Sequence, residues 1–241
     1  MAAGRSRTRR APVDLTAIRT RKRAPGPDRD MMRRGARLFL AGSGETGLKR
    51  DMKRTPERVA QAWSTEILAG YRSDARRILA TSFRSPEDGM VLVSRISFVS
   101  VCVHHLLPFL GEAHVAYLPG GRLIGLSKIA RTVDALARRL QLQERLGRQI
   151  VEVLDDALAP RGSACRLEAE HLCMSVRGAR KRGSRVVTTS YSGVFQATPA
   201  LRAEFLRLCG APPPAETTPR RPRRSAARRH RRPARRGARR G

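Results

Sequence analysis

The sequence predicts an α+β domain built on an antiparallel sheet and preceded by a helical N-terminal region. Three observations favour this fold class. The first part of the chain has apolar residues at helical spacing, two strand-like segments follow, and two helices then precede two further strands. A β-β-α-α-β-β order of this kind describes a sheet whose helices are inserted between strand pairs.

The helical N-terminal part is predicted over residues 31–85. Residues 31–40 have a short apolar and basic helical pattern, which ends at a glycine-rich loop. A second helix is expected to start at Thr55, which can cap it, with Pro56 in the first turn. Its apolar residues recur at helical spacing until Gly70 ends the segment.

The sheet is predicted within residues 86–211. Its strands are expected at 91–103, 113–118, 165–174 and 185–195. Two helices lie between the second and third strands. Ser127 can cap the first, the second starts near Gln143, and the sequence Pro160-Arg161-Gly162 ends it. A last short helix is expected at 201–208.

Basic residues dominate the charge of the chain, which has 241 residues and a net charge of +30. More than half of this excess lies in residues 1–30 and 212–241, with net charges of +6 and +11. We expect both tails to be disordered, because such segments repel themselves and have little to bury. The second tail is rich in Arg and Pro and could contact nucleic acid non-specifically, although it has no aromatic residues to stack on bases. A solvated tail with no selected role is the alternative, and composition alone favours it.

The sequence also limits where the protein acts. No apolar run approaches the ~18 residues of a membrane-spanning helix, and the Arg-rich start lacks the apolar segment of a secretory signal. We therefore expect a cytoplasmic protein without a membrane partner. Four cysteines are too few for a small disulfide scaffold, so thiols or metal ligands are the better interpretation.

A metal site is one interpretation of the motif Cys102-Val103-His104-His105. A Cys and a His three apart can bind one tetrahedral ion, and Cys173 is the expected third ligand. Three protein ligands leave a position for water, as in a catalytic zinc site. His171 precedes Cys173 by two residues, so in a strand both face one side, with His171 toward a substrate. Buried cysteines acting as small apolar residues are the alternative.

A second candidate cluster is cationic. Lys128 and Arg131 lie one helical turn apart at the predicted start of a helix, where a phosphate is favoured. Arg177 and Arg58 could add donors, although each, taken alone, is better interpreted as a solvated surface charge. The pair Gln143-Glu144 would ordinarily complement a helix dipole. Its functional alternative is recognition of a guanine edge.

These motifs together resemble the GTP cyclohydrolase I family. The resemblance covers residues 31–210 and rests on five separate motifs in order. They are Thr55-Pro56-Glu57-Arg58-Val59-Ala60, Cys102-Val103-His104-His105-Leu106-Leu107-Pro108-Phe109, Gly125-Leu126-Ser127-Lys128-Ile129-Ala130-Arg131, Gln141-Leu142-Gln143-Glu144-Arg145-Leu146 and His171-Leu172-Cys173-Met174 with Arg177-Gly178.

The resemblance implies a tunnelling fold, in which two helices back a four-stranded antiparallel sheet, assembled as a homodecamer of two pentamers. It implies hydrolysis of GTP to formate and 7,8-dihydroneopterin triphosphate, the first step of tetrahydrofolate and pterin biosynthesis. One Zn²⁺ per subunit would be bound by Cys102, His105 and Cys173. The catalytic residues would be His104, His171 and Ser127; the guanine-binding residues Glu144 and Gln143; and the triphosphate-binding residues Lys128, Arg131, Arg177 and Arg58.

One residue departs from the family pattern. Val103 stands where the family usually has Glu, which removes a charge beside the metal loop but no predicted ligand. Two other functions stay open on the sequence: a tunnelling-fold enzyme acting on another purine or pterin, and a basic nucleic-acid-binding protein. A zinc deaminase is less favoured, because its H-x-E and P-C-x-x-C pairing is missing.

Overall fold

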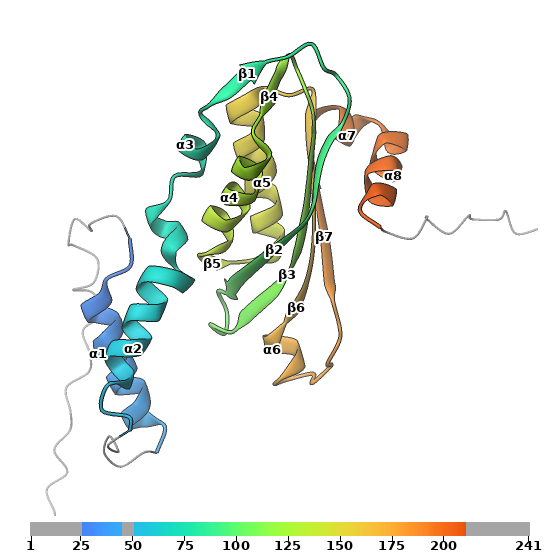
Figure 1. Ribbon diagram of the computed structural model, residues 1–241. Helices are drawn as coiled ribbons and strands as arrows, with labels where there is room; N and C mark the ends of the chain where they lie inside the picture. Colours follow the sequence, from blue (N-terminus) through green and yellow to red (C-terminus); the bar gives the residue numbers. More distant parts are fainter. Residues whose placement is uncertain (1–25, 45–50, 211–241) are drawn as a thin grey trace, which may run out of the picture.

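The computed structural model describes residues 26–44 and 51–210 and confirms the α+β class (Figure 1). The predicted tail 212–241 lies outside the described residues, as does all but the end of the tail 1–30. No helix within the described ranges is long and apolar enough to cross a membrane.

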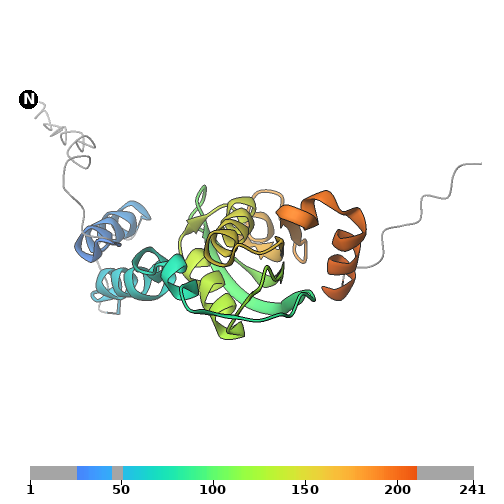
Figure 2. The same cartoon turned by 90° about the horizontal axis from the view of Figure 1, so that it is seen from above.

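The N-terminal helices lie side by side, away from the main sheet (Figures 1 and 2). The first is α1 (Arg29–Gly42), capped by Asp28, whose side chain accepts a hydrogen bond of 2.9 Å from the Met31 N–H. The second, α2 (Thr55–Ala62), starts at Thr55 itself and has no side-chain cap, so the predicted capping by Thr55 is wrong. Beyond α2, the predicted single helix divides.

Two irregular turns continue the chain after α2. They are the π-helix η2 (Trp63–Ile67) and the 3₁₀-helix η3 (Ala69–Arg72). Gly70 lies inside η3, where a Cβ atom would collide with the carbonyl oxygens of Ala135 and Arg138. The absence of a side chain at Gly70 therefore lets this turn pack closely against the neighbouring helix. Gly70 also marks the point where the helical spacing of apolar residues ends.

A short helix and a two-stranded sheet, none of them predicted, follow. The helix α3 (Ala75–Leu79) begins after Asp74, which accepts hydrogen bonds from two backbone N–H groups. The strands β1 (Ser82–Arg84) and β4 (Arg122–Ile124) then pair antiparallel.

The main sheet has the order β5-β2-β3-β6-β7. Its four long strands are the predicted ones and pair antiparallel, with revised ends. They are β2 (Val91–Cys102), β3 (Pro108–Leu118), β6 (Gly162–His171) and β7 (Val186–Tyr191). The two-residue strand β5 (Leu140–Gln141), which was not predicted, runs parallel to the end of β2.

Two helices cover one face of this sheet, as the sequence predicts. They are α4 (Leu126–Ala137) and α5 (Gln143–Leu158), whose buried residues recur at helical spacing. Each buried Leu or Ile of these stripes contributes about 1.5–3 kcal/mol of transfer free energy. Ser127 is the second residue of α4 and Gly125 is the N-cap, so the predicted capping by Ser127 is wrong.

The opposite face is covered only in part. Helices α7 (Gly193–Ala197) and α8 (Pro199–Leu208) bury Phe195 and Phe205 against two small residues of the sheet. Polar residues occupy much of the rest of this face. The ends of β2 and β6 meet the start of α5 at one end of the sheet, where the candidate site lies.

Candidate active site

The three predicted metal ligands lie together. One ligand atom each from Cys102, His105 and Cys173 lies within 4.8 Å of the other two. Cys102 is the buried last residue of β2, and His105 lies in the exposed turn that follows. Cys173 lies in the single helical turn α6 (Leu172–Ser175), because β6 ends at His171, three residues before the predicted strand end.

A tight turn brings His105 back over Cys102. The Cys102 N–H donates to the Leu107 carbonyl, and the Leu106 N–H donates to the Cys102 carbonyl, each at 2.9 Å. Leu106 has a φ of 55°, a left-handed conformation that reverses the chain within few residues. The chain then enters β3 directly, since Val101 pairs with Pro108.

The donor set fits a metal ion. Two thiols and one imidazole are ligands that zinc prefers, and three of them leave one position open. Burial and the adjacent Cys102 raise the pKa of the Cys173 thiol, while Arg177 acts in the opposite direction. Two sulfur atoms this close would repel each other as thiolates, so a cation between them is what would allow both to be deprotonated.

His171 is held in one orientation beside this group. Its Nε2 lies 2.8 Å from the side-chain oxygen of Gln143, and its Nδ1 lies 4.0 Å from the Cys173 sulfur. Phe109 stacks on the imidazole, with ring centroids 4.5 Å apart and planes 5° apart. Burial lowers the pKa of His171, and the nearby Glu144 carboxylate partly offsets that effect.

Gln143 does not have the position expected of a guanine ligand. Its side chain is 1% exposed, and its Nε2 donates to the carbonyls of Leu167 at 3.2 Å and Val186 at 2.9 Å and to the hydroxyl of Thr188 at 3.2 Å. The amide is thus occupied by protein partners. Glu144, the next residue, is exposed and close enough to His171 to influence its pKa, so it is the accessible member of the pair.

His104 lies on the exposed side of the same turn. Its Nδ1 is 4.0 Å from the Cys102 sulfur, and its ring centroid is 6.2 Å from that of His105. An exposed imidazole beside the candidate metal group is accessible to a bound substrate.

Ser127 and most of the cations predicted to bind the triphosphate do not lie beside the candidate metal group. Ser127, Lys128 and Arg131 belong to α4, whose start follows Ile124, and the Ile124 N–H donates to the Tyr117 hydroxyl at 3.3 Å. Tyr117 is roughly 30 Å of strand away from the metal end of β3.

The positions of Lys128 and Arg58 agree with this separation. Lys128 donates to the Thr81 carbonyl at 3.1 Å, and Arg58 lies on α2. Of the cations predicted to bind the triphosphate, Arg177 is the one whose charge acts on Cys173 of the same chain.

Comparison with known proteins defines the family. Residues 32–210 match the family model described as GTP cyclohydrolase I. The chain belongs to the GTP cyclohydrolase I family. It is 47% identical over 174 residues to GTP cyclohydrolase 1 of Sinorhizobium fredii, an alignment that covers 71% of this chain and 84% of that protein. It is 44% identical over 199 residues to GTP cyclohydrolase 1 of Rhodopirellula baltica, covering 82% and 86%.

A third GTP cyclohydrolase 1, from Brucella suis, is 42% identical over 200 residues, which cover 82% of this chain and 92% of that protein. Among solved structures, the crystal structure of the apo form of archaeosine synthase QueF-Like matches with a TM-score of 0.38 and 20% identity, covering 44% of this chain and 96% of that chain.

Two supporting residues of this GTP cyclohydrolase I family member were not predicted as part of the site. Phe109 stacks on His171, and the carbonyl of Gln141 accepts the Val103 N–H at 3.1 Å, which ties the metal turn to β5. Both residues belong to the motifs that carry the family resemblance, but spacing alone does not reveal such contacts.

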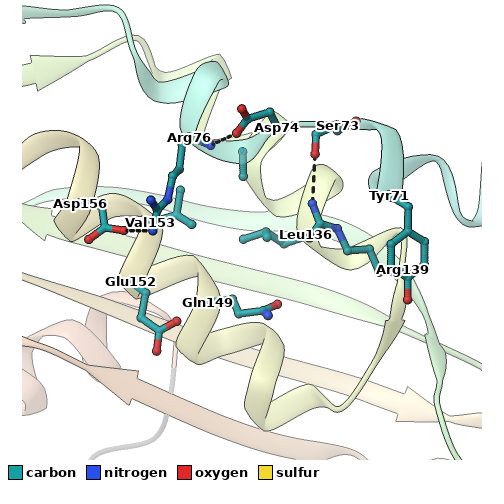
Figure 3. Close-up of a pocket in the computed structure, with 11 residues that line it drawn as sticks. Tyr71, Ser73, Asp74, Arg76, Leu136, Arg139, Gln149, Glu152, Val153 and Asp156 are labelled. Carbon is teal, nitrogen blue, oxygen red and sulfur yellow. Dashed lines mark hydrogen bonds and ion pairs between the residues drawn. The ribbon is translucent and has the colours of Figure 1, made fainter. Parts of the chain in front are cut away.

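A hollow of about 470 Å³ lies elsewhere in this GTP cyclohydrolase I family member, between η3, α4 and α5 (Figure 3). None of the predicted site residues lines it. Its arginines already have partners: Arg139 donates to the Ser73 carbonyl at 3.1 Å, and Arg76 pairs with Asp156 at 2.6 Å. These contacts attach the segment before β1 to the helix layer, which is a structural role.

Proposed function

We propose that the protein is a GTP cyclohydrolase I, which opens the imidazole ring of GTP by hydrolysis and yields formate and 7,8-dihydroneopterin triphosphate. The observation that carries this proposal is the convergence of Cys102, His105 and Cys173 next to an oriented His171, in a chain of this family. The resemblance to the GTP cyclohydrolase I family also supports the tunnelling fold, with the catalytic part at 86–211 and the helical part at 31–85.

The three ligands would hold Zn²⁺. When bound, zinc supplies a Lewis acid that makes water a nucleophile near neutral pH. Val103 leaves this arrangement intact, because the residue contributes its backbone N–H to Gln141 and its side chain is not a ligand.

The histidines of the site would move protons. C8 of guanine becomes a good electrophile when N7 is protonated, and the exposed imidazole of His104 would serve that step. His171 would act at the substrate and its ribose. Its hydrogen bond to Gln143 supports this role. The side-chain nitrogen of Gln143 already donates to other protein groups, so its oxygen faces His171 and must accept a hydrogen bond. Nε2 of His171 therefore carries the hydrogen, and Nδ1 has the free lone pair. Ser127, which lies on α4 beside Lys128 and away from His171 of its own chain, would assist proton transfer during rearrangement of the ribose from a neighbouring subunit.

Recognition of guanine would depend on Glu144. A carboxylate can accept two parallel N–H groups from the guanine edge, and Glu144 is exposed beside His171. In this proposal Gln143 holds His171 in place of contacting the base.

The triphosphate would be bound by Lys128, Arg131, Arg177 and Arg58. Because Lys128 and Arg131 lie far from the metal group of their own chain, we infer that a neighbouring subunit brings them to it. The edges of the sheet support such an assembly. The outer edge of β7 and most of the outer edge of β2 are unpaired in the described residues, and pairing β2 of one chain with β7 of the next would form a closed ring. The family resemblance indicates a homodecamer of two pentamers.

Incubation of the purified, metal-loaded protein with GTP tests the proposed activity. We expect release of formate and, after oxidation, a fluorescent pterin, and we expect a chelator to abolish both and added zinc to restore them. Metal-loaded protein that yields neither product would overturn the proposal. A second preparation without residues 212–241 should retain turnover, whereas a protein that acts by binding nucleic acid would lose its affinity.

A further inference from the structure

A second polar site lies on the sheet face opposite α4 and α5. It is a cavity of about 250 Å³ beside the end of α8, where Cys209 and Gly210 form part of its wall. Four ionisable residues of β3 and β6 also line it. They are Glu112, His114, Arg166 and Glu168. No proposed substrate or metal ligand belongs to it.

The strand register places these four residues in two facing pairs. His114 pairs with Arg166 across the strands, and Glu112 pairs with Glu168. Glu112 and Glu168 carry like charges, and a protonated His114 would carry the same charge as Arg166. Like charges that face each other across strands are unfavourable without further partners. Two arginines compensate Glu168: Arg166 at 2.6 Å and Arg185 at 3.7 Å.

His114 is the unusual member of the group. It is 3% exposed, and its Nδ1 is buried without a hydrogen-bond partner among the described residues. Burial, followed by the charge of Arg166, lowers the pKa of His114, so the neutral imidazole with one N–H to donate prevails at neutral pH. A buried polar atom without a partner is costly, and a ligand in the cavity would provide one.

Arg95 supplies an unpaired charge at the same cavity. It lies in the β-bulge between Val93 and Ile96 with a φ of 55°, a conformation that a non-glycine residue rarely adopts. In the described residues it has no carboxylate within ion-pair distance. The bulge thus directs an additional arginine to a wall that already carries Arg166 and Arg185.

We propose that this cavity binds a phosphate group, which Arg95, Arg166 and His114 hold. The arginine fork matches the geometry of a phosphate, and the lining has three arginines against two glutamates. The spacing of the carboxylates, His114 and Cys209 does not favour a metal ion: within the described residues, the ligand atoms that cluster closely enough for one ion are those of Cys102, His105 and Cys173. The inference does not depend on the proposed enzymatic activity.

Titration calorimetry of the full-length, metal-loaded protein at constant ionic strength tests the site. All proteins carry Arg131→Gln, which weakens phosphate binding at the proposed substrate site. We expect inorganic phosphate to bind, and Arg95→Gln to raise the Kd at least about tenfold, the effect of losing one charge-assisted hydrogen bond. Arg161→Gln, a change at an exposed arginine outside the cavity, is the matched control and should leave the Kd unchanged.

Further ligands and a second variant complete the test. His114→Gln should also weaken the binding of phosphate. If that variant does not fold, the comparison of Arg95→Gln with Arg161→Gln decides, because Arg95 is exposed. Glycerol 3-phosphate is tested separately: tighter binding than inorganic phosphate identifies an organic phosphate as the ligand, and weaker binding identifies the free ion. Equal Kd values for Arg95→Gln and Arg161→Gln would overturn the proposal, and so would acetate binding as tightly as phosphate.

Discussion

The side-chain oxygen of Gln143 lies 2.8 Å from Nε2 of His171, at the start of α5. Three contacts from Nε2 of Gln143 fix which end of the amide faces the histidine. A glutamine in the helix layer therefore determines which nitrogen of His171 carries the hydrogen, and Phe109 fixes the plane of the ring.

Replacing Gln143 with Met keeps the volume but removes every one of these hydrogen bonds. We expect kcat for formate release to fall by about 10- to 100-fold, because a misplaced catalytic group costs that much. The free energy of unfolding should fall by about 1–3 kcal/mol, because the carbonyls of Leu167 and Val186 lose a donor. Bound metal, measured by mass spectrometry, should be unchanged; loss of metal would instead make Gln143 part of the metal site.

Ligand substitutions test the metal group. Cys173→Ser should lower both the zinc content and the turnover to near background, because a structural or catalytic zinc needs its thiolate. Cys165→Ala is the control: this thiol is fully buried in β6, its pKa is raised by burial, and it is no member of the ligand group. Full zinc occupancy in Cys173→Ser would contradict the assignment.

Glu144 provides a test of base recognition. Glu144→Gln should lower kcat/KM for GTP by about 10- to 100-fold through the loss of a charge-assisted hydrogen bond. Inosine triphosphate lacks the exocyclic amino group of guanine, so the preference for GTP over it should narrow in the variant. Glu152→Gln, at an exposed position of the same helix, should change neither value.

The stability of the fold should depend on His114 at mildly acidic pH. Its folded-state pKa lies below the usual 6.5, because burial and Arg166, with a smaller effect of Arg95, outweigh Glu112 and Glu168. The unfolded chain therefore takes up the proton first as the pH falls below 6.5, which destabilises the fold. We expect the urea midpoint of the wild-type protein to fall more between pH 7 and pH 5.5 than that of His114→Gln, in phosphate-free buffer. Parallel curves would contradict this expectation.

Gly70 and Gly35 should respond in opposite ways to alanine. Gly70→Ala places a Cβ against the carbonyls of Ala135 and Arg138 and should cost about 1–3 kcal/mol of unfolding free energy. Gly35 lies inside α1, and a Cβ there meets no atom within 4 Å. Gly35→Ala should therefore stabilise the protein by up to about 1 kcal/mol, which urea unfolding would measure.

The sequence predicted the four long strands and the helix α5, because their alternation or helical spacing extends over many residues. The strands β1, β4 and β5 were missed, since two or three residues carry too little pattern.

The same distinction applies to the residues of the candidate site: sequence motifs predict some of them, and the folded sheet alone positions others. The three residues of the candidate metal group were predicted from motifs, whereas the position of Gln143 was not. Its partners lie between 24 and 45 residues away, so only the folded sheet brings them together.

Cys102 is the last residue of β2 and Cys173 follows β6, and these two strands are separated in the sheet by β3. The two sulfur atoms therefore lie within reach of one ion only when three strands hold their native register, so metal binding depends on the assembled sheet. A slip of one residue along β3 would move the two thiols apart and turn side chains to the wrong face. The fraction of chains that retain zinc would then report how much of a preparation has its sheet correctly assembled.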